Sequence, residues 1–283
     1  MKLPSGGFLD FSGPALVMAI INCNDDSFYP SSRALAEEAV EKALAAEDAG
    51  ANIIDFGAES SRPGSDYIDK EEEIRRLIPV IEIFRKKSSL PVSVDTRKAA
   101  VARSALDAGA DIINDISALV NDEDMAILCA ERNAAVVLMH MKGNPKIMQN
   151  SPEYTDVVSE VQDFLLSAAE RAMAAGIQRD KIILDPGIGF GKRTCDNLSL
   201  IACLAEIRCK GYPILVGLSR KSFIADICNR PLSERLAGTM AANAAAIMAG
   251  ADIIRVHDVR EGVDLAKVLY AIREKSNGMV STF

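Results

Sequence analysis

Ionisable and amide side chains directly follow a series of short apolar runs in this chain of 283 residues. They include carboxylates, amides, both histidines and several cations, which together could accept hydrogen bonds, donate them and bind an anion. Their positions are Asn22, Asp26, Asp55, Asp95, Asn114, His140, Asp185, Lys192, Ser219, Lys221, Arg255 and His257. One Asp or Asn after a strand often only caps the next helix, but a set that also carries Lys, Arg and His indicates a functional site.

The apolar runs that precede these residues are the candidate strands. Three of them share the pattern Ala-Gly-Ala-Xaa-Ile-Ile, which begins at Ala49, Ala108 and Ala249. In each repeat the glycine ends an Ala-rich helix in a left-handed conformation, and the Ile pair belongs to a buried strand. The eight predicted strands cover 15–21, 52–56, 91–94, 111–113, 135–139, 181–184, 213–218 and 252–256.

Helical stretches separate these strands, so that one strand and one helix together take about 35 of the 283 residues. The total is close to the roughly 250 residues of a (β/α)8 barrel. We therefore predict the α/β class and a closed parallel (β/α)8, or TIM, barrel that forms a single domain over residues 1–283. A doubly wound open sheet is the alternative, because its strands are equally apolar. In a barrel, the chemistry takes place where the strands end, which is where the polar residues are found.

Composition excludes several classes of protein. Hydrophobic residues at 49% and charged residues at 25% are typical of a folded globular chain. The formal net charge is -8 and the basic residues form no long block, so we expect no nucleic-acid partner. The apolar run 15–21 is too short to span a bilayer, and no basic region precedes it as in a signal peptide. We therefore expect a cytoplasmic protein with no membrane partner.

Cysteine and histidine usage limits the metal and redox chemistry. The six cysteines form no CxxC pair, so a disulfide framework is not expected. With two histidines and no HExxH motif, a typical zinc site is excluded, which leaves only a hard ion bound by oxygen atoms. The segment 187–194 resembles a P-loop, but Pro186 replaces its first glycine and Arg193 its Ser or Thr. Ser219 lies outside a GxSxG motif, which argues against hydrolase chemistry.

Taken in order, the strand-end motifs resemble those of the dihydropteroate synthases, folate-pathway enzymes with a (β/α)8 barrel. The resemblance covers nearly the whole chain. It is carried by NCNDDSF from Asn22, GAESSRPG from Gly57, SVDT from Ser93, NDI from Asn114, HMKGNPKIMQ from His140, DPGIGFGK from Asp185, SRK from Ser219 and RVHDV from Arg255. Each motif alone is weak, but the set is specific because every motif stands at a predicted strand end.

The resemblance implies a transferase reaction of folate biosynthesis. In it, 6-hydroxymethyl-7,8-dihydropterin pyrophosphate condenses with p-aminobenzoate to give 7,8-dihydropteroate and pyrophosphate. The carbon–oxygen bond breaks largely before the amine attacks, so no base is needed to activate the aniline. The resemblance also implies Mg2+ as the cofactor, bound through Asn22 and phosphate oxygens, and a homodimer formed through the late helices. The p-aminobenzoate site would be the target of sulfonamides.

Roles for individual residues follow from the same resemblance. Asp185 would accept two hydrogen bonds from the guanidine-like edge of the pterin. The pterin pocket would consist of Asp95, Asn114, Met139, Asp185, Phe190, Gly217, Lys221 and Arg255. The pyrophosphate would be bound by Asn22, Arg255 and His257, and p-aminobenzoate by Ser61, Arg62, Pro63, Phe190 and Ser222. The catalytic residues would be Asp26, Lys221 and Arg255. Asp26 would stabilise the cation that forms on the pterin methylene.

Two loops depart from the usual family pattern. Cys23, Asn24 and Asp25 replace Val, Thr and Pro in the first loop, and Ala58 and Ser61 replace Gly and Thr in the second. Asp25 adds a negative charge near the expected pyrophosphate, which would weaken its binding unless the side chain points to solvent or reaches the metal.

Some strand-end residues are expected to be structural. We assign this role to Asp55 and Asp115, while packing at a strand end explains His140 and Met141 as well as a role in the site does.

Three other functions remain open. A methyltransferase that moves a methyl group from a tetrahydrofolate to a corrinoid would share the pterin-binding Asp and Asn groups, but it has no use for a phosphate clamp. An aldolase would use Lys221 as a Schiff-base lysine. A non-catalytic pterin binder would result if the altered first loop abolished turnover.

Overall fold

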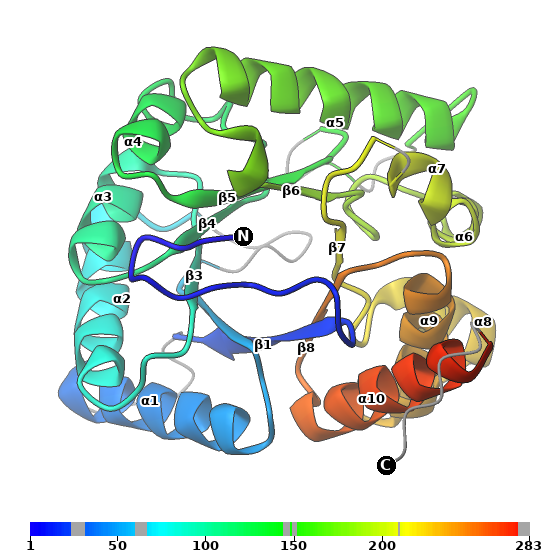
Figure 1. Ribbon diagram of the computed structural model, residues 1–283, viewed down its shortest axis with the longest axis horizontal. Helices are drawn as coiled ribbons and strands as arrows, with labels where there is room; N and C mark the ends of the chain where they lie inside the picture. Colours follow the sequence, from blue (N-terminus) through cyan, green and yellow to red (C-terminus); the bar gives the residue numbers. More distant parts are fainter. Residues whose placement is uncertain (24–31, 60–66, 144–147, 149–151, 209, 277–283) are drawn as a thin grey trace.

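The computed structural model shows an eight-stranded barrel surrounded by helices (Figure 1). It describes residues 1–23, 32–59, 67–143, 148, 152–208 and 210–276. The strands are β1 (Leu16–Asn22), β2 (Ile53–Gly57), β3 (Val92–Asp95), β4 (Ile112–Asp115), β5 (Ala135–Met139), β6 (Ile182–Asp185), β7 (Leu215–Val216) and β8 (Ile253–Val256). The helices are α1 (Ser32–Asp48), α2 (Lys70–Arg85), α3 (Ala99–Asp107), α4 (Met125–Glu131), α5 (Val157–Ala174), α6 (Thr194–Ala202), α7 (Leu204–Arg208), α8 (Ser222–Cys228), α9 (Leu236–Met248) and α10 (Val259–Ser276), with 3-10 turns η1 (Arg179–Lys181) and η2 (Leu232–Glu234).

The strands pair in parallel, and the sheet closes on itself. Their hydrogen-bonded order is β6-β5-β4-β3-β2-β1-β8-β7. The two strands at the ends of this order meet through a parallel bridge between Leu184 and Ile214, and the Leu184 N–H donates to the Pro213 carbonyl at 2.9 Å. The predicted (β/α)8 barrel is confirmed, and the open sheet is wrong. Several strands extend beyond the predicted ends because polar residues such as Asp95 and Asp185 still belong to the sheet.

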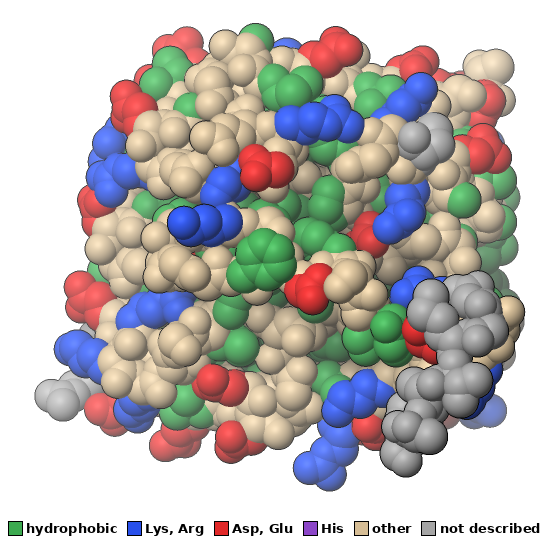
Figure 2. All heavy atoms as spheres, in the orientation of Figure 1, with side chains coloured by type: hydrophobic (Ala, Val, Ile, Leu, Met, Phe, Trp, Pro, Cys, Tyr) green, Lys and Arg blue, Asp and Glu red, His purple; other side chains and the backbone are tan. Residues whose placement is uncertain are grey.

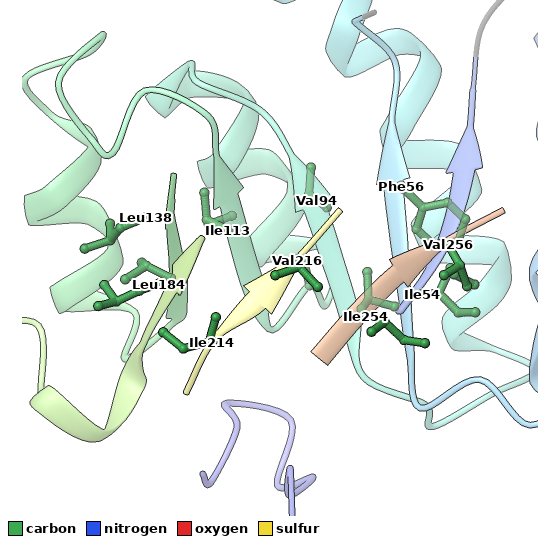
Figure 3. Packing of buried hydrophobic residues seen from close by; sticks show 14 of the residues in the cluster. Ile54, Phe56, Val94, Ile113, Leu138, Leu184, Ile214, Val216, Ile254 and Val256 are labelled. Atoms are coloured by element: carbon green, nitrogen blue, oxygen red, sulfur yellow. The ribbon is translucent and has the colours of Figure 1, made fainter. Parts of the chain in front are cut away.

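Side chains alternate along each strand between two layers. Ile54, Ile113 and Ile254 belong to the large cluster that packs between the strands and the surrounding helices (Figure 3). The residues one position earlier, such as Ile53 and Ile112, belong to a separate cluster inside the barrel. This alternation is the two-residue period of a β-strand, and it explains why the strands are apolar on both faces.

The N-terminal segment covers the end of the barrel at which the strands begin (Figure 1). Leu3 and Leu9 are each 2% exposed and join the interior cluster. An antiparallel bridge between Lys2 and Phe8 folds the segment back on itself. This end of the barrel is therefore filled with apolar side chains, which leaves the opposite end for a polar site.

Figure 2 shows the face that the N-terminal segment crosses, with Lys and Arg interspersed among Asp and Glu. No helix in the described part of the chain has both the length and the apolar character needed to cross a membrane.

Asp111 ties this end of the barrel together. Its side chain is fully buried, at 0% exposure, directly before β4. It accepts a hydrogen bond from Arg85 Nη2 at 2.5 Å, one from the Val92 N–H at 3.1 Å and one from the Ser5 N–H at 3.0 Å. One carboxylate thus joins α2, β3 and the N-terminal segment.

Replacing Asp111 should destabilise the fold strongly, because Asp111→Ala leaves the Arg85 guanidinium without its buried partner. We expect the free energy of unfolding, measured by urea denaturation, to fall by about 3 kcal/mol. Asp107→Ala is the control, since it breaks the more exposed pair with Arg132, whose side chains are 53% and 38% exposed, and should cost less than about 1 kcal/mol. Equal losses in the two variants would contradict this assignment.

Candidate active site

The polar residues at the open end of the barrel continue the inward-facing rows of the strands. Because side chains on one face of a strand repeat every two residues, a position two residues after an interior core residue also points inward. Asp55 follows Ile53 in this way, and Asp185 follows Ile183. The same spacing relates Asn114 to Ile112, Met139 to Val137, Gly217 to Leu215 and Arg255 to Ile253. These positions therefore face one barrel mouth, and Asp95 on β3 is joined to them through Arg255.

Arg255 is the centre of an ion-pair network in this mouth. Its Nε donates to Asp55 Oδ2 at 2.6 Å, and its Nη2 donates to Asp95 Oδ2 at 3.0 Å. Asn114 Nδ2 donates to the same Asp55 oxygen at 3.3 Å. Asp55 is 0% and Asn114 4% exposed, so the network is largely shielded from water. It connects β2, β3, β4 and β8.

The carboxylates of the mouth have altered acidity. Burial raises the pKa of Asp95, with Arg255 acting against the shift and Asp55 adding to it. Burial also raises the pKa of Asp185 to about 6, although its hydrogen bond from the Gly187 N–H at 2.7 Å and the nearby Lys221 favour the ionised form. Burying an ionised carboxylate costs free energy, and a ligand that donates hydrogen bonds to the carboxylate offsets this cost.

Apolar side chains form one wall of the mouth. Phe190 and Met139 are 8% and 3% exposed and form a small cluster with Met148, apart from the main core. Lys221 Nζ lies 4.0 Å from the centre of the Phe190 ring, which is a cation–π contact. Gly189 has φ +82°, and a Cβ there would lie 3.2 Å from Lys221 Cδ. Glycine at this position therefore leaves room for Lys221 beside the ring.

More exposed polar groups stand around this buried set. His257 is exposed, and its Nδ1 lies 2.9 Å from Ser219 Oγ, so that residues following β8 and β7 are joined. Arg220 donates to Asp258 through two hydrogen bonds of 3.1 and 2.6 Å. Asn22 is exposed at the end of β1. The predicted pyrophosphate residues Asn22 and His257 are thus more accessible than the carboxylates of the pocket.

Asn22 is also the predicted metal ligand. Within the described ranges, no group of three or more His, Cys, Asp or Glu residues could hold a metal ion. Mg2+ usually keeps several waters and binds through one or two protein oxygens together with substrate phosphates. A single exposed amide oxygen fits a magnesium ion that arrives with a pyrophosphate, and it does not fit an ion held by protein side chains alone.

Several predicted site residues cannot be placed. Asp26 and the p-aminobenzoate residues Ser61, Arg62 and Pro63 lie outside the described residues, as do the altered positions Asn24 and Asp25. Of the two remaining p-aminobenzoate residues, Phe190 lies beside Lys221, and Ser222 is exposed and begins α8 directly after Lys221.

A second buried ion network lies at Glu59, directly before residues 60–66. Glu59 accepts hydrogen bonds from Arg97 Nη2 at 2.6 Å and from Lys98 Nζ at 2.5 Å. Lys98 also donates to Glu73 in α2 at 2.5 Å, and Glu73 is 0% exposed. These ion pairs join the residues that follow β2 and β3 to α2.

Sequence reasoning did not foresee that Asp55, which we expected to be structural, is joined to the predicted site residues Arg255 and Asn114. The signal was present in the repeats: the residues that follow the three Ile pairs are Asp55, Asn114 and Arg255, and these three side chains are joined by hydrogen bonds. Asp115, in contrast, accepts hydrogen bonds from the N–H groups of Ser117 and Leu119 and holds the turn after β4, as expected.

Known proteins of one kind resemble the chain over nearly its full length. A family model described as pterin-binding enzyme matches residues 18–257. The dihydropteroate synthase of Escherichia coli (strain K12) is 45% identical over 273 residues, which cover 96% of each chain.

Solved structures show the same similarity in three dimensions. The structure of Yersinia pestis dihydropteroate synthase with a sulfonamide drug has a TM-score of 0.90 and 41% identity, and covers 95% of this chain and 98% of that one. The Xanthomonas albilineans enzyme in complex with 7,8-dihydropteroate has a TM-score of 0.84 and 39% identity, and the match covers 95% of this chain and 96% of that one. The sequence comparison and the structure comparison therefore point to the same kind of protein.

Asp55→Asn should impair the site, because Arg255 loses its closest ionic partner while the shape of the side chain is kept. We expect kcat/KM for pyrophosphate release from the dihydropterin pyrophosphate to fall by about tenfold or more. Asp252→Asn is the matched control: Asp252 accepts from Arg208 Nη2 at 2.8 Å and directly precedes β8, the strand of Arg255, at the opposite end of the barrel. A wild-type kcat/KM in Asp55→Asn would show that the network does not serve the reaction.

Proposed function

The chain belongs to the dihydropteroate synthase family of pterin-binding enzymes, and from this premise we propose which of its residues carry the family's reaction. The reaction is the condensation of 6-hydroxymethyl-7,8-dihydropterin pyrophosphate with p-aminobenzoate in folate biosynthesis. The observation that supports the assignment best is the convergence of Asp185, Asp95, Asn114, Lys221 and Arg255 on one barrel mouth.

The pterin ring is bound by the buried polar groups. Asp185 accepts two hydrogen bonds from the ring's N–H edge, Asp95 and Asn114 complete that edge, and Lys221 donates to the carbonyl and ring-nitrogen side. Met139, Phe190 and Gly217 border the ring. A heterocycle with the wrong pattern of donors would leave buried groups unpaired, at a cost of about 1–3 kcal/mol for each group.

The pyrophosphate binds at the accessible edge. Arg255 reaches it from the pocket, where its flat guanidinium also stacks on the pterin, while Asn22 and His257 bind from the rim. Asn22 would hold Mg2+ together with the phosphate oxygens, and the ion would neutralise charge on the leaving group. Rupture of the carbon–oxygen bond releases pyrophosphate and leaves a cation on the pterin methylene, which Asp26 stabilises.

The aniline nitrogen of p-aminobenzoate then forms the new carbon–nitrogen bond and gives up one proton to water. Ser61, Arg62, Pro63, Phe190 and Ser222 are the residues proposed to bind this substrate. Because an aniline is already nucleophilic, the enzyme acts mainly by holding the two reactants in position and by stabilising charge.

The alternatives are less well supported. A corrinoid methyltransferase does not need the phosphate-binding residues Arg255 and His257, and the similarity over nearly the full length is to dihydropteroate synthases. The same similarity speaks against an aldolase with a Schiff base on Lys221. Release of pyrophosphate in the presence of p-aminobenzoate distinguishes an enzyme from a non-catalytic pterin binder.

The homodimer, Mg2+ and the cytoplasmic location stay predictions, as does the single domain over 1–283. For the homodimer, exposed apolar side chains on the late helices are the support: Met248 on α9 is 65% exposed, and Val268 and Ile272 on α10 are 58% and 53% exposed. A second copy of the chain covering this surface would remove them from water.

The purified protein should release pyrophosphate when it is mixed with the pterin pyrophosphate, Mg2+ and p-aminobenzoate. Release should depend on all three components, and dihydropteroate should appear in equal amount. Pterin binding by calorimetry without pyrophosphate release would support the non-catalytic binder and overturn the proposed reaction.

Pterin affinity should fall below about pH 6. Asp185 accepts the ring's N–H groups only when it is ionised, and burial raises its pKa to about 6. Calorimetry with 6-hydroxymethylpterin, which carries no titrating phosphate, should show full affinity at pH 8 and about tenfold weaker binding at pH 5. Asp185→Asn should bind no pterin at either pH while its melting temperature stays close to that of the wild type. Wild-type affinity in this variant would remove Asp185 as the ring anchor.

A further inference from the structure

Lys192 is a buried lysine to which the reaction assigns no role. It ends the motif that begins at Asp185 and is 3% exposed. Its Nζ lies 2.8 Å from His140 Nδ1, 2.9 Å from the Gly187 carbonyl oxygen, 3.1 Å from that of Phe190 and 3.3 Å from that of His140. A P-loop lysine in this place would bind phosphate, whereas the Nζ of Lys192 is surrounded by buried protein acceptors.

The partners of Lys192 are all suited to accept from it. The carbonyl oxygens can only accept. Burial and the nearby Lys192 lower the pKa of His140 to about 3, so its ring is neutral, and in the tautomer with the proton on Nε2 its Nδ1 accepts from Lys192. An apolar side chain at position 192 would take a donor from each of these buried acceptors, and among them the Gly187 carbonyl would keep the Phe190 N–H at 3.1 Å. The cluster therefore requires a donor with several N–H groups, which a lysine supplies.

The two loops joined by Lys192 lie in very close contact. Gly187 has φ +67°, and a Cβ there would lie 1.9 Å from the His140 carbonyl oxygen. Gly191 has φ +63°, and a Cβ there would lie 2.4 Å from the Lys142 carbonyl oxygen. The loop after β6 thus runs directly against the loop after β5, and only glycine allows this approach.

The segment that Lys192 fixes carries two of the proposed pterin contacts. The Gly187 N–H donates to Asp185 Oδ1 at 2.7 Å, and the Phe190 ring lies 4.0 Å from Lys221 Nζ. Lys192 binds the carbonyl groups of the same two residues, Gly187 and Phe190. The orientation of the Asp185 carboxylate and the place of the Phe190 ring therefore both depend on the backbone that Lys192 holds.

We propose that Lys192 is a positioning residue for pterin binding: it holds the loop after β6 against β5 so that Asp185 and Phe190 are arranged for the ring before the ligand arrives. The inference rests on the proposed function, because it concerns the same pocket. Lys192 acts through Asp185 and Phe190 and does not itself touch the substrate.

A second buried lysine of the β6 unit provides a matched control. Lys181 directly precedes β6, is also 3% exposed and donates through Nζ to the Lys2 carbonyl at the closed end of the barrel. Lys192→Met and Lys181→Met both remove a buried amino group and keep an unbranched apolar chain. Any general effect of losing a buried lysine is common to the two variants, whereas an effect on the pocket is expected only for Lys192→Met.

The test measures the affinity of each variant for 6-hydroxymethylpterin by calorimetry, well below the melting temperature of the less stable variant. We expect Kd to rise by about tenfold or more in Lys192→Met and to stay within about twofold of wild type in Lys181→Met. In turnover assays, KM for the pterin pyrophosphate should rise in Lys192→Met by a larger factor than kcat falls.

The possible outcomes distinguish a failure of the proposed function from a failure of the positioning role of Lys192. If the wild-type protein does not bind the pterin, the proposed function fails. If the wild type binds and Lys192→Met binds equally well, or if both lysine variants lose affinity equally, the positioning role alone is overturned. If Lys192→Met does not fold, His140→Phe decides, since it removes the closest acceptor of Lys192 but keeps an aromatic ring. We expect about threefold weaker binding in that variant, and unchanged affinity would overturn the role of Lys192.

Discussion

A guanidinium held between two carboxylates inside the barrel is the interaction on which the rest of the site depends. Arg255 bonds to Asp55 and Asp95, and Asp55 bonds in addition to Asn114. A buried charge without a partner would cost several kcal/mol, so these groups fix one another's positions. Because they come from four different strands, the pairing also ties the chemistry of the site to the closure of the barrel. Asp185 and Lys221 then complete a pocket whose polar groups are arranged before the ligand binds.

The residues that stabilise the fold and the residues of the site lie at opposite ends of the barrel. At the end where the strands begin, the N-terminal segment and an apolar cluster fill the interior, and Asp111 joins three elements through buried hydrogen bonds. At the other end, the same inward-facing rows continue with carboxylate, amide and guanidinium groups. The period of two residues in each strand links the two ends, so a polar residue two positions after a core residue enters the pocket. The loops beyond the strands add contacts such as the one between Lys221 and Phe190.

Much of this organisation could be predicted from the sequence. The apolar runs gave the strands, and the repeated Ala-Gly-Ala pattern gave the helix-to-strand turns, because glycine and buried Ile pairs are strong local signals. Some strand ends were placed too early, since a polar residue such as Asp185 is paired in the sheet although it ends the apolar run. The ion pair of Asp55 could not be foreseen, because a lone Asp after a strand looks like a helix cap and its partner Arg255 lies 200 residues away. The contacts of Lys192 with backbone carbonyls leave no sequence pattern at all.

The central claim is that Asp185 and the network of Arg255 form one preorganised pterin pocket. A crystal structure of the protein with 6-hydroxymethyl-7,8-dihydropterin pyrophosphate tests this most directly. The account predicts the ring's N–H edge on the Asp185 carboxylate, Arg255 against the ring and the pyrophosphate, and the pair between Arg255 and Asp55 still intact. A pterin bound away from Asp185, or an Arg255 that has left Asp55 to reach the ligand, would contradict it.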